Sequence, residues 1–545
     1  MVDLKKIIDG MTVEELCGQV LAYDVQPRDE EEETLSVIRK IKPGTLFIGG
    51  VERDSVERLQ PFFRQFAKYR DAATEASGIP CMVATDIENG PGSFCKPLPE
   101  LPNPMAWGAC NDEKLIERAG ELTGRICRRI GVHYTLGPVV DLSLNFRNPL
   151  VSVRGVSDSP ERVIRIAGAY LKGVQKNGNL AGCLKHFPGD GVDERNQHFL
   201  TSVNSLSREE WMATYGKIYR ELFQRGANSV MVGHISCPAF QEGETDEYGA
   251  LPGTLSKALI TDLLKGELGF GGCVISDAMS MIGACARVPE DKLAVSFFQA
   301  GGDLMLFPRP EEHGYLVRAV ESGELSVERM KDAAYRCLKL KEQVRLFDES
   351  FRIDGDGAEE DIAELEELCE KIAAGAVKIV RNNENVLPVR KEKGKVLLLK
   401  FSGSYFNTQP AEAPFRFIER EFEEQGWQVD SFFFAKHEQL KRVMNDYDLV
   451  VIASHANYHG STLRVGWDNI MALWRGYVLQ HDKVVFVGLD DPYKLFDFPY
   501  AKTYVNTFGE SPSLQRALVR VILGKIQPKA QNPISFGGYF EREGD

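Results

Sequence analysis

The chain has 545 residues, of which 43% are hydrophobic and 26% charged, which is ordinary for a globular protein and long enough for two or three domains. Its formal net charge of −14 opposes binding to nucleic acid and to anionic membrane surfaces, whereas a neutral ligand is indifferent to it. The sequence has no apolar run of about 18 residues and no signal-peptide pattern at residues 1–21, so we expect a cytoplasmic protein that does not cross a membrane.

From residue 45 onward, short apolar runs alternate with longer amphipathic stretches that end in glycine, as helices often do. The runs are TLFIGG, CMVATD, YTLGPVVD, LAGCLKH, SVMVGH, GCVISD and DLMLF, and the stretches include residues 112–131, 159–178 and 207–226. This alternation predicts a parallel sheet covered by helices. About seven or eight such units favour a TIM-type (β/α)8 barrel over residues 1–349, although an open doubly wound sheet remains possible.

After the barrel pattern, residues 350–377 read as an acidic, glycine-containing linker followed by a helix. Residues 378–545 again alternate apolar runs, such as KVLLLKFSG and KVVFVGLDD, with helix-like stretches. We therefore expect a smaller three-layer α/β sandwich domain here. The eleven cysteines lie singly between Cys17 and Cys369, without a C-x-x-C pair, and are expected to be reduced and buried.

Several of the predicted strands end in an ionisable side chain. These side chains are Asp86, Asp141, Lys185 with His186, His234 and Asp277. In a parallel barrel the carboxyl ends of the strands surround one mouth, which is where such folds keep their chemistry. The alternatives are that each residue merely meets solvent at a strand end, and that Asp277 caps a following helix.

The chemistry of these residues fits a polar, uncharged ligand. Positive charge from Lys185 and His186 would hold Asp277 ionised and able to attack an electrophile. Together with Asp86 and Arg154, these groups offer many directional hydrogen bonds, as a sugar requires. The same ring would also suit an anionic ligand, and spacing does not decide between the two.

No metal or cofactor is expected. His455 and His459 in HANYH are four residues apart, but the surrounding sequence disfavours a helix and no third ligand follows. The glycines of FIGG and GDG match neither a Walker loop nor a dinucleotide fingerprint.

Motifs spread along nearly the whole chain resemble glycoside hydrolase family 3, in particular its two-domain β-N-acetylhexosaminidases. The motifs are MTVEELCGQVL, IPCMVATDIENG, NPLVSVRGVSDSPERV, KHFPGDG, VISDAMSM, AAGAVKIVRNNENVLPV and NTFGESPSLQRALVRVILGKIQP. The resemblance implies that Asp277 is the nucleophile of a retaining hydrolase and that His198, on a mobile loop, is its acid/base. It also implies that the substrate, an amino-sugar glycoside with N-acetylglucosamine as the first choice, is bound by Asp86, Arg154, Lys185, His186 and His234.

The chain departs from the family at two positions. Asn196 stands where the family has the aspartate that pairs with the acid/base histidine, and Pro91 stands where an arginine usually holds the substrate. An amide oxygen can accept a hydrogen bond from imidazole but offers no charge. The chain is thus a weakened or engineered variant, or uses a neighbouring Asp190, Asp193 or Glu194 for the charge, or has lost catalysis.

Four functions compete on this basis. The first is a β-N-acetylhexosaminidase, and the nearest alternative is a phosphorylase that transfers the sugar to phosphate. A non-catalytic sugar-binding protein is motivated by Asn196, and an aldolase-type barrel would use Lys185 as a Schiff base. In the second domain, residues 454–468 are a candidate contact loop, and the sequence does not indicate the oligomeric state.

Overall fold

The computed structural model describes residues 2–26, 30–50, 59–348, 350–351, 357–403, 413–433, 444–456 and 481–544. They form two compact units. The first comprises residues 1–99, 116–141 and 167–365, and the second comprises residues 100–115, 142–166 and 366–545. The division differs from the contiguous domains that we predicted, because Met105, Ala106 and Val153 contribute to the apolar core of the second unit.

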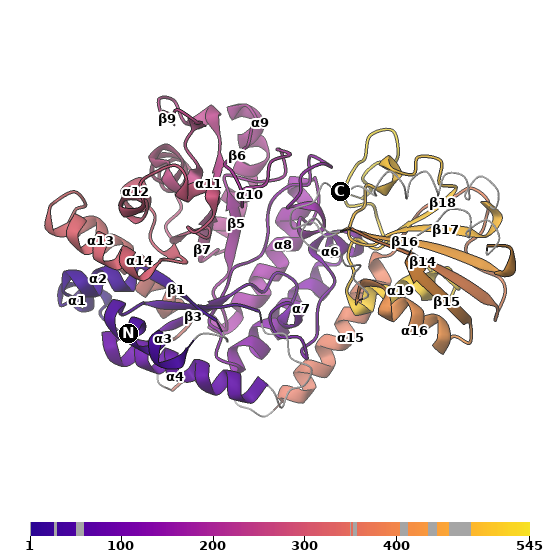
Figure 1. Cartoon of the computed structure of the whole chain (residues 1–545), viewed down its shortest axis with the longest axis horizontal. Helices are drawn as coiled ribbons and strands as arrows, with labels where there is room; N and C mark the ends of the chain where they lie inside the picture. The colour runs from indigo at the N-terminus through magenta and orange to yellow at the C-terminus, as the bar shows by residue number, and fades with distance from the viewer. Residues whose placement is uncertain are drawn as a thin grey trace. The chain divides into compact units, whose positions relative to one another are not determined.

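Among its described residues, the first unit contains two larger parallel sheets (Figure 1), besides the two-stranded pairs β6 (Ser202–Val203) with β8 (Ile235–Ser236) and β9 (Thr245–Asp246) with β10 (Gly249–Ala250). The strands of the two larger sheets are β1 (Leu21–Val25), β2 (Thr45–Ile48), β3 (Met82–Thr85), β4 (Tyr134–Thr135), β5 (Cys183–Phe187), β7 (Ser229–Val232), β11 (Cys273–Ser276) and β12 (Met305–Leu306). One sheet has the order β12-β1-β2-β3-β4 and the other has the order β11-β7-β5. Seven of these strands fall within the predicted apolar runs, and β1, which includes the polar Asp24, was not predicted.

Isolated parallel bridges join the two sheets at both ends. These bridges are Tyr134 to Ala181, Val139 to Lys185 and Ile275 to Leu304. Eight parallel strands therefore follow one another in a closed order, β1, β2, β3, β4, β5, β7, β11 and β12, as a curled parallel sheet. The carboxyl ends of the strands consequently share one edge, and the residues that follow each strand gather there.

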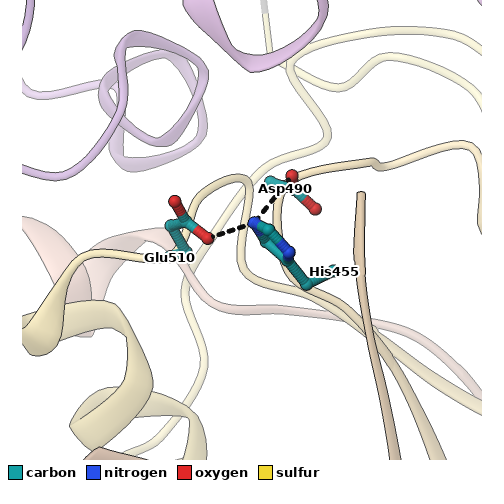
Figure 2. Close-up of side chains that lie close together, drawn as sticks. All are labelled: His455, Asp490 and Glu510. Atoms are coloured by element: carbon teal, nitrogen blue, oxygen red, sulfur yellow. Dashed lines mark ion pairs between the residues drawn. The ribbon is translucent and has the colours of Figure 1, made fainter. Parts of the chain in front are cut away.

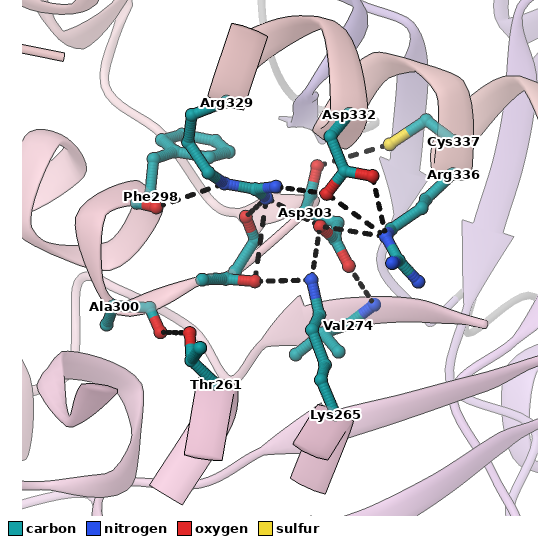
Figure 3. A network of polar contacts seen from close by, with 12 residues as sticks. Thr261, Lys265, Val274, Phe298, Ala300, Asp303, Arg329, Asp332, Arg336 and Cys337 are labelled. Carbon is teal, nitrogen blue, oxygen red and sulfur yellow. Dashed lines mark hydrogen bonds and ion pairs between the residues drawn. The ribbon is translucent and has the colours of Figure 1, made fainter. Parts of the chain in front are cut away.

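A buried ion network supports the junction between β11 and β12 (Figure 3). Asp303, which is fully buried, accepts a hydrogen bond from the Val274 amide at 2.9 Å. Its other carboxylate oxygen lies 2.8 Å from Lys265 Nζ and 2.6 Å from Arg329 Nη2. Because β11 carries Asp277 at its other end, this network fixes the strand that positions the predicted nucleophile.

Helices connect the strands of the first unit. The longer ones are α3 (Glu31–Ile41), α4 (Leu59–Ser77), α7 (Glu113–Arg129), α8 (Pro160–Gln175), α10 (Tyr215–Gln224), the π-helix η6 (Ala258–Glu267), α12 (Leu293–Ala300), α13 (Pro310–Glu321) and α14 (Val327–Gln343). Shorter helices are α1 (Leu4–Asp9), α2 (Val13–Gln19), α5 (Pro91–Phe94), α9 (Arg208–Ala213) and α11 (Ile282–Cys285). The single helix predicted over 207–226 is interrupted at Thr214, whose hydroxyl donates to the Glu210 carbonyl at 2.7 Å and so competes with the helical pattern.

The second unit is built on one sheet of six strands in the order β13-β18-β17-β16-β14-β15. The strands are β13 (Lys378–Asn382), β14 (Lys395–Gly403), β15 (Gln428–Phe433), β16 (Leu449–Ala456), β17 (Val484–Gly488) and β18 (Thr503–Asn506). All neighbours pair in parallel except β13 and β18, which are antiparallel. Helices α6 (Pro104–Cys110), α15 (Ala358–Ala376), α16 (Arg416–Glu424) and α19 (Pro512–Ile522) contribute to its core.

The predicted linker and helix at 350–377 is divided between the units, because α15 begins in the first and ends in the second. Residues 352–356 of the predicted linker, and residue 349 at the end of the predicted barrel, lie outside the described residues. All eleven cysteines are free, and only Cys285 is exposed. Among the helices that the structure describes, none is both long and apolar enough to cross a membrane.

Candidate active site

Asp277 lies directly after β11 at the shared strand edge. Its amide donates to the Val232 carbonyl at 2.8 Å, and its Oδ1 accepts a hydrogen bond from the Ala278 amide at 2.8 Å. Burial alone would raise the pKa of Asp277, but His186, His234, the Ala278 amide and His198 together lower it below the ordinary value. Asp277 does not cap the next helix, since α11 begins at Ile282, and it stays ionised at neutral pH.

Lys185, within β5, is a buried cation held by two carboxylates. Its Nζ lies 3.0 Å from Asp86 Oδ1 and 2.7 Å from Glu88 Oε1. The Asp86 side chain is 54% exposed, whereas that of Lys185 is only 4% exposed, so Asp86 is the member of the pair that a ligand can reach. Glu88 was not predicted, since nothing in the sequence DIENG distinguishes it from a solvated loop acid.

His186 is fixed by Asp141, a fully buried carboxylate. Asp141 accepts hydrogen bonds from the His186 amide, at 3.1 Å to Oδ1, and from the Asp190 amide at 2.8 Å. Its Oδ2 lies 2.7 Å from His186 Nδ1. Because an ionised carboxylate only accepts, Nδ1 carries the hydrogen and the ring orientation is set. The peptide bonds Lys185–His186 and Phe187–Pro188 are both cis.

His234, which follows β7, has both ring nitrogens engaged within the protein. Nε2 lies 2.9 Å from the Ala278 carbonyl, which can only accept, so Nε2 is the protonated nitrogen. Nδ1 therefore accepts a hydrogen bond from the Thr254 hydroxyl at 2.9 Å. Burial lowers the pKa of His234, in agreement with this neutral tautomer. The His234 ring thus fixes the position of Ala278, the residue that follows Asp277.

The predicted partners Asn196 and His198 are in contact. Asn196 Oδ1 lies 3.0 Å from the His198 amide nitrogen and 2.7 Å from Nδ1 of the ring. A backbone N–H can only donate, so the atom facing it is the amide oxygen, and the same oxygen then accepts from Nδ1–H. Asn196 therefore selects the tautomer in which Nε2 is the nitrogen that exchanges a proton.

The loop that carries His198 is tied to two neighbouring segments. The buried Gln197 accepts a hydrogen bond from the His234 amide at 3.0 Å through its Oε1. The Ile282 amide donates to the His198 carbonyl at 3.3 Å, and Thr201 Oγ1 donates to the Gly283 carbonyl at 2.9 Å. These bonds hold the loop beside the segment that follows Asp277, so the two halves of the predicted catalytic pair lie in one cluster.

The acids that could replace the missing carboxylate have other partners. Asp193 Oδ2 lies 2.6 Å from Arg195 Nε and accepts from the Val203 amide at 2.8 Å. Asp190 Oδ1 accepts from the Gly191 amide at 2.7 Å. The charge of Asp193 is thus balanced by Arg195 within the loop.

The remaining predicted residues lie in the second unit. Arg154, in the short helix η2 (Ser152–Arg154), is buried and donates from Nη1 to the Leu150 carbonyl at 3.2 Å. Its assignment to substrate stays a prediction. His455 lies at the end of β16, and His459 lies outside the described residues.

Four residues of the site were missed or given no role in the sequence analysis. They are Glu88, Asp141, Gln197 and Thr254. Asp141 carried a signal, a carboxylate at the end of an apolar run, but its role depends on His186, 45 residues further along the chain. Gln197 and Thr254 carried no recognisable signal.

Comparisons with known proteins identify the family of the chain. Residues 12–340 match the Glycosyl hydrolase family 3 N terminal domain. A protein of Cellulomonas fimi named Beta-N-acetylglucosaminidase/beta-glucosidase is 31% identical over 475 residues, which are 84% of each chain.

Solved structures extend the similarity to the whole fold. Beta-glucoside phosphorylase BglX, bound to 2FGlc, superposes with a TM-score of 0.86 at 26% identity and covers 98% of this chain and 96% of its own. The family 3 beta-N-acetylglucosaminidase of Paenibacillus sp. str. FPU-7 superposes with a TM-score of 0.82 at 23% identity, over 96% and 99% of the two chains, and at this identity shares the fold alone.

The family match and the name of the relative from Cellulomonas fimi show that the chain is an enzyme of the glycosidase class. The chain belongs to glycosyl hydrolase family 3, as its motifs predicted.

Proposed function

We propose that the enzyme removes terminal β-linked N-acetylhexosamine, with N-acetylglucosamine as the first candidate, through a covalent intermediate on Asp277. The observation that carries this proposal is the Asp277 carboxylate, whose pKa is lowered by surrounding imidazoles and the Ala278 amide despite its burial. The amino sugar is supported by the name of the relative from Cellulomonas fimi, Beta-N-acetylglucosaminidase/beta-glucosidase. Because this name also includes beta-glucosidase, a glucoside is the natural comparison substrate.

The reaction would proceed in two displacements. In the first, Asp277 forms a bond to the anomeric carbon while protonated His198 gives its Nε2 proton to the leaving oxygen. In the second, Nε2 takes a proton from water, whose oxygen displaces Asp277 and restores the original anomeric configuration. The bond from Nδ1 to Asn196 supports this role, since it leaves Nε2 as the exchanging nitrogen in both steps.

The substrate hydroxyls would be bound at the Lys185 cluster. Exposed Asp86 is suited to accept from two hydroxyls while Lys185 and Glu88 fix its position. We propose His234 as a positioning residue for the Asp277–Ala278 segment, because both of its ring nitrogens bond within the protein. Arg154 is proposed as a ligand of the sugar by the family resemblance.

We also propose that the closed order of eight strands is the predicted (β/α)8 barrel and that the second unit is an α/β sandwich. The bridges that join the two sheets support the closure. The TM-score of 0.86 to the structure of beta-glucoside phosphorylase BglX, over 98% of the chain, supports both folds.

Phosphorolysis is a second candidate, and Asn196 favours it. A phosphate anion that attacks the glycosyl-enzyme is repelled by negative charge near the acid/base. Here the partner of His198 is a neutral amide, so the pair brings no such charge. The similarity to a structure named beta-glucoside phosphorylase points the same way.

Product analysis with and without phosphate distinguishes the candidates. Aryl N-acetyl-β-glucosaminide and aryl β-glucoside are incubated with the enzyme, and the sugar products are identified. Free N-acetylglucosamine in both buffers supports the hydrolase, and a sugar 1-phosphate formed only with phosphate supports the phosphorylase. Sugar binding without turnover of either substrate would overturn both proposals in favour of a non-catalytic binder.

A mechanism-based inactivator tests the nucleophile directly. A 2-fluoro or 5-fluoro sugar forms a slowly hydrolysed glycosyl-enzyme, and peptide mass spectrometry locates the label. The label is expected on the peptide that contains Asp277, and a label elsewhere would refute the proposed mechanism. Borohydride trapping at Lys185 would instead support the Schiff-base chemistry considered from the sequence.

A further inference from the structure

A second group of titratable side chains lies in the second unit, at the carboxyl ends of three neighbouring strands (Figure 2). His455 is the last residue but one of β16, Asp490 follows β17, and Glu510 follows β18. In the strand order β15-β14-β16-β17-β18, the chain continues from β14 to one side and from β16 to the other. The switch point therefore lies between β14 and β16, beside His455. In open parallel sheets, ligands bind outside the carboxyl ends of the strands at such a switch point.

The three side chains converge closely enough to share one cation. His455 Nε2 lies 2.6 Å from Glu510 Oε2 and 3.5 Å from Asp490 Oδ2. All three donor atoms lie within 4.8 Å of one another. Around a tetrahedral Zn²⁺, with bonds of about 2.0–2.1 Å, donor atoms stand ~3.3 Å apart. The separation to Asp490 already fits, and the one to Glu510 needs to open by ~0.7 Å.

Of the three side chains, the one that has to move to admit the cation is also the most exposed. His455 and Asp490 are buried, whereas the Glu510 side chain is 38% exposed. Glu510 can therefore move outward to admit a cation while the other two donors stay fixed by the sheet.

The imidazole also has the support that metal-binding histidines usually have. Its Nδ1 lies 3.3 Å from Ser402 Oγ on β14, which can accept from Nδ1–H and so direct the Nε2 lone pair toward the two carboxylates. Phe415 contacts the ring edge to face, with centroids 6.3 Å apart. These contacts orient Nε2 from outside the donor set.

Charge balance at this edge also favours a cation. Next to the group, Lys494 lies 2.7 Å from Asp491 and 3.6 Å from Asp497, and all three side chains are buried. Even when protonated, His455 brings one positive charge against the two carboxylates of Asp490 and Glu510. A divalent cation in place of the Nε2 proton would balance the charges of these two carboxylates.

We propose that His455, Asp490 and Glu510 bind a divalent first-row transition cation. An imidazole with two carboxylates is a donor set for Zn²⁺ or Mn²⁺ rather than for Mg²⁺, which prefers oxygen alone. The site would tie the ends of β16, β17 and β18 together, and it is independent of the proposed reaction. The HANYH spacing failed to indicate it because the second and third ligands come from other strands.

Metal titration of the full chain tests the site. The protein is treated with EDTA, dialysed, and titrated with ZnCl2, MnCl2 or MgCl2 by calorimetry. One Zn²⁺ per chain is expected, with Mg²⁺ binding at least ~10-fold more weakly. Glu510→Gln should weaken Zn²⁺ binding by at least ~10-fold, and the exposed control Glu392→Gln should leave it unchanged. Since Glu510 is half-exposed, its variant is expected to keep the wild-type circular dichroism spectrum.

The active-site histidines are a competing source of zinc binding, and a further variant separates the two. In His198→Gln the tight Zn²⁺ stoichiometry should be unchanged, and Co²⁺ should give the visible absorption of a tetrahedral N/O site that disappears in Glu510→Gln. Zinc binding that survives Glu510→Gln but is lost in His198→Gln would overturn the proposal, as would the absence of stoichiometric binding to the wild type.

Discussion

Both units gather ionisable side chains at the carboxyl ends of parallel strands, but the proportion of acidic to basic groups is opposite in the two. In the first unit, Asp277 is surrounded by several imidazoles, and its pKa is lowered. In the second, one imidazole lies between two carboxylates. Burial disfavours the charged form of His455, but Asp490 and Glu510 outweigh it and raise the pKa of His455 to about 9. The proportion of carboxylates to imidazoles is thus reversed between the two edges, although the residues of both lie at or near the carboxyl ends of strands.

This difference shows that strand topology determines where the ionisable residues gather, whereas the ratio of carboxylates to imidazoles determines which chemistry they can support. One ionised carboxylate among histidines with fixed tautomers suits nucleophilic attack and proton transfer. Two carboxylates against one histidine suit a cation. A substitution that removes or adds a carboxylate should therefore have different consequences in the two units.

The largest effect is expected from Asp277→Asn, which removes the ionisable group from the first edge. Turnover of the aryl glycoside should fall by at least ~10⁴-fold, because an amide is a poor nucleophile, while sugar affinity changes little. Steady-state kinetics and equilibrium binding measure the two effects. The exposed Asp262→Asn, in η6, serves as the matched control and should retain wild-type kinetics. Activity within ~10-fold of wild type in Asp277→Asn would contradict the assignment.

The second effect concerns the stability of the strand that carries Asp277. Asp303→Asn leaves Lys265 and Arg329 without their buried counter-charge and should lower the free energy of unfolding of the first unit by about 3–5 kcal/mol. Thermal melts monitored by circular dichroism measure it. Asp332, whose side chain is 46% exposed, pairs with the same Arg329, and Asp332→Asn should cost less than ~1 kcal/mol. Equal losses in the two variants would exclude a special role for the buried carboxylate.

Glu312, a carboxylate whose pKa is raised, should behave in the opposite way to Asp277. Burial raises the pKa of Glu312 to about 7, although Arg309 lies 3.0 Å away and opposes the shift. Ionisation of Glu312 therefore lowers the free energy of unfolding. This loss is absent below pH 4.5, grows as the pH rises, and is nearly complete above about pH 7. Glu312→Gln should stabilise the protein at pH 8 by up to about 3 kcal/mol and have little effect at pH 4. A stability difference that does not change with pH would show that Glu312 is not the titrating group.

The smallest effect is expected from restoring charge beside His198. Asn196→Asp should raise the rate of hydrolysis by roughly 10-fold, because a carboxylate stabilises the protonated imidazole. If the enzyme is a phosphorylase, the same change should lower the rate with phosphate through repulsion. The ratio of free sugar to sugar 1-phosphate measures both. Asn196→Ala, which lacks the acceptor, should slow both reactions, and identical ratios in the wild type and Asn196→Asp would contradict the charge argument.

Much of the fold was predictable from local patterns. The run KVLLLKFSG coincides with β14, and Asp277 directly follows β11 as predicted. Lys185, which was expected at a strand end, lies in the middle of β5 because that strand continues to Phe187. The prediction missed β15, whose sequence QVDSFF is half polar. Such a strand is stabilised by its neighbour, here β14, rather than by its own composition.

The candidate site was predictable only where the motif is local. Asn196 and His198 are two residues apart, so their contact could be inferred from the sequence and is confirmed by the structure. Asp141 and Gln197 act on His186 and His234 from distant positions in the chain. The contacts that fix these rings exist only after the strands have assembled.

Periodicity was enough to predict the alternation of strands and helices and the place of Asp277 at a strand end, and the resemblance of local motifs indicated the family. The tautomers of His198 and His234, the balance of charge around Asp277, and the convergence of His455 with Asp490 and Glu510 could be established only from the folded chain. Each of these depends on distances of a few ångströms between segments that are far apart in the chain, and electrostatic and hydrogen-bond energies are determined at that range.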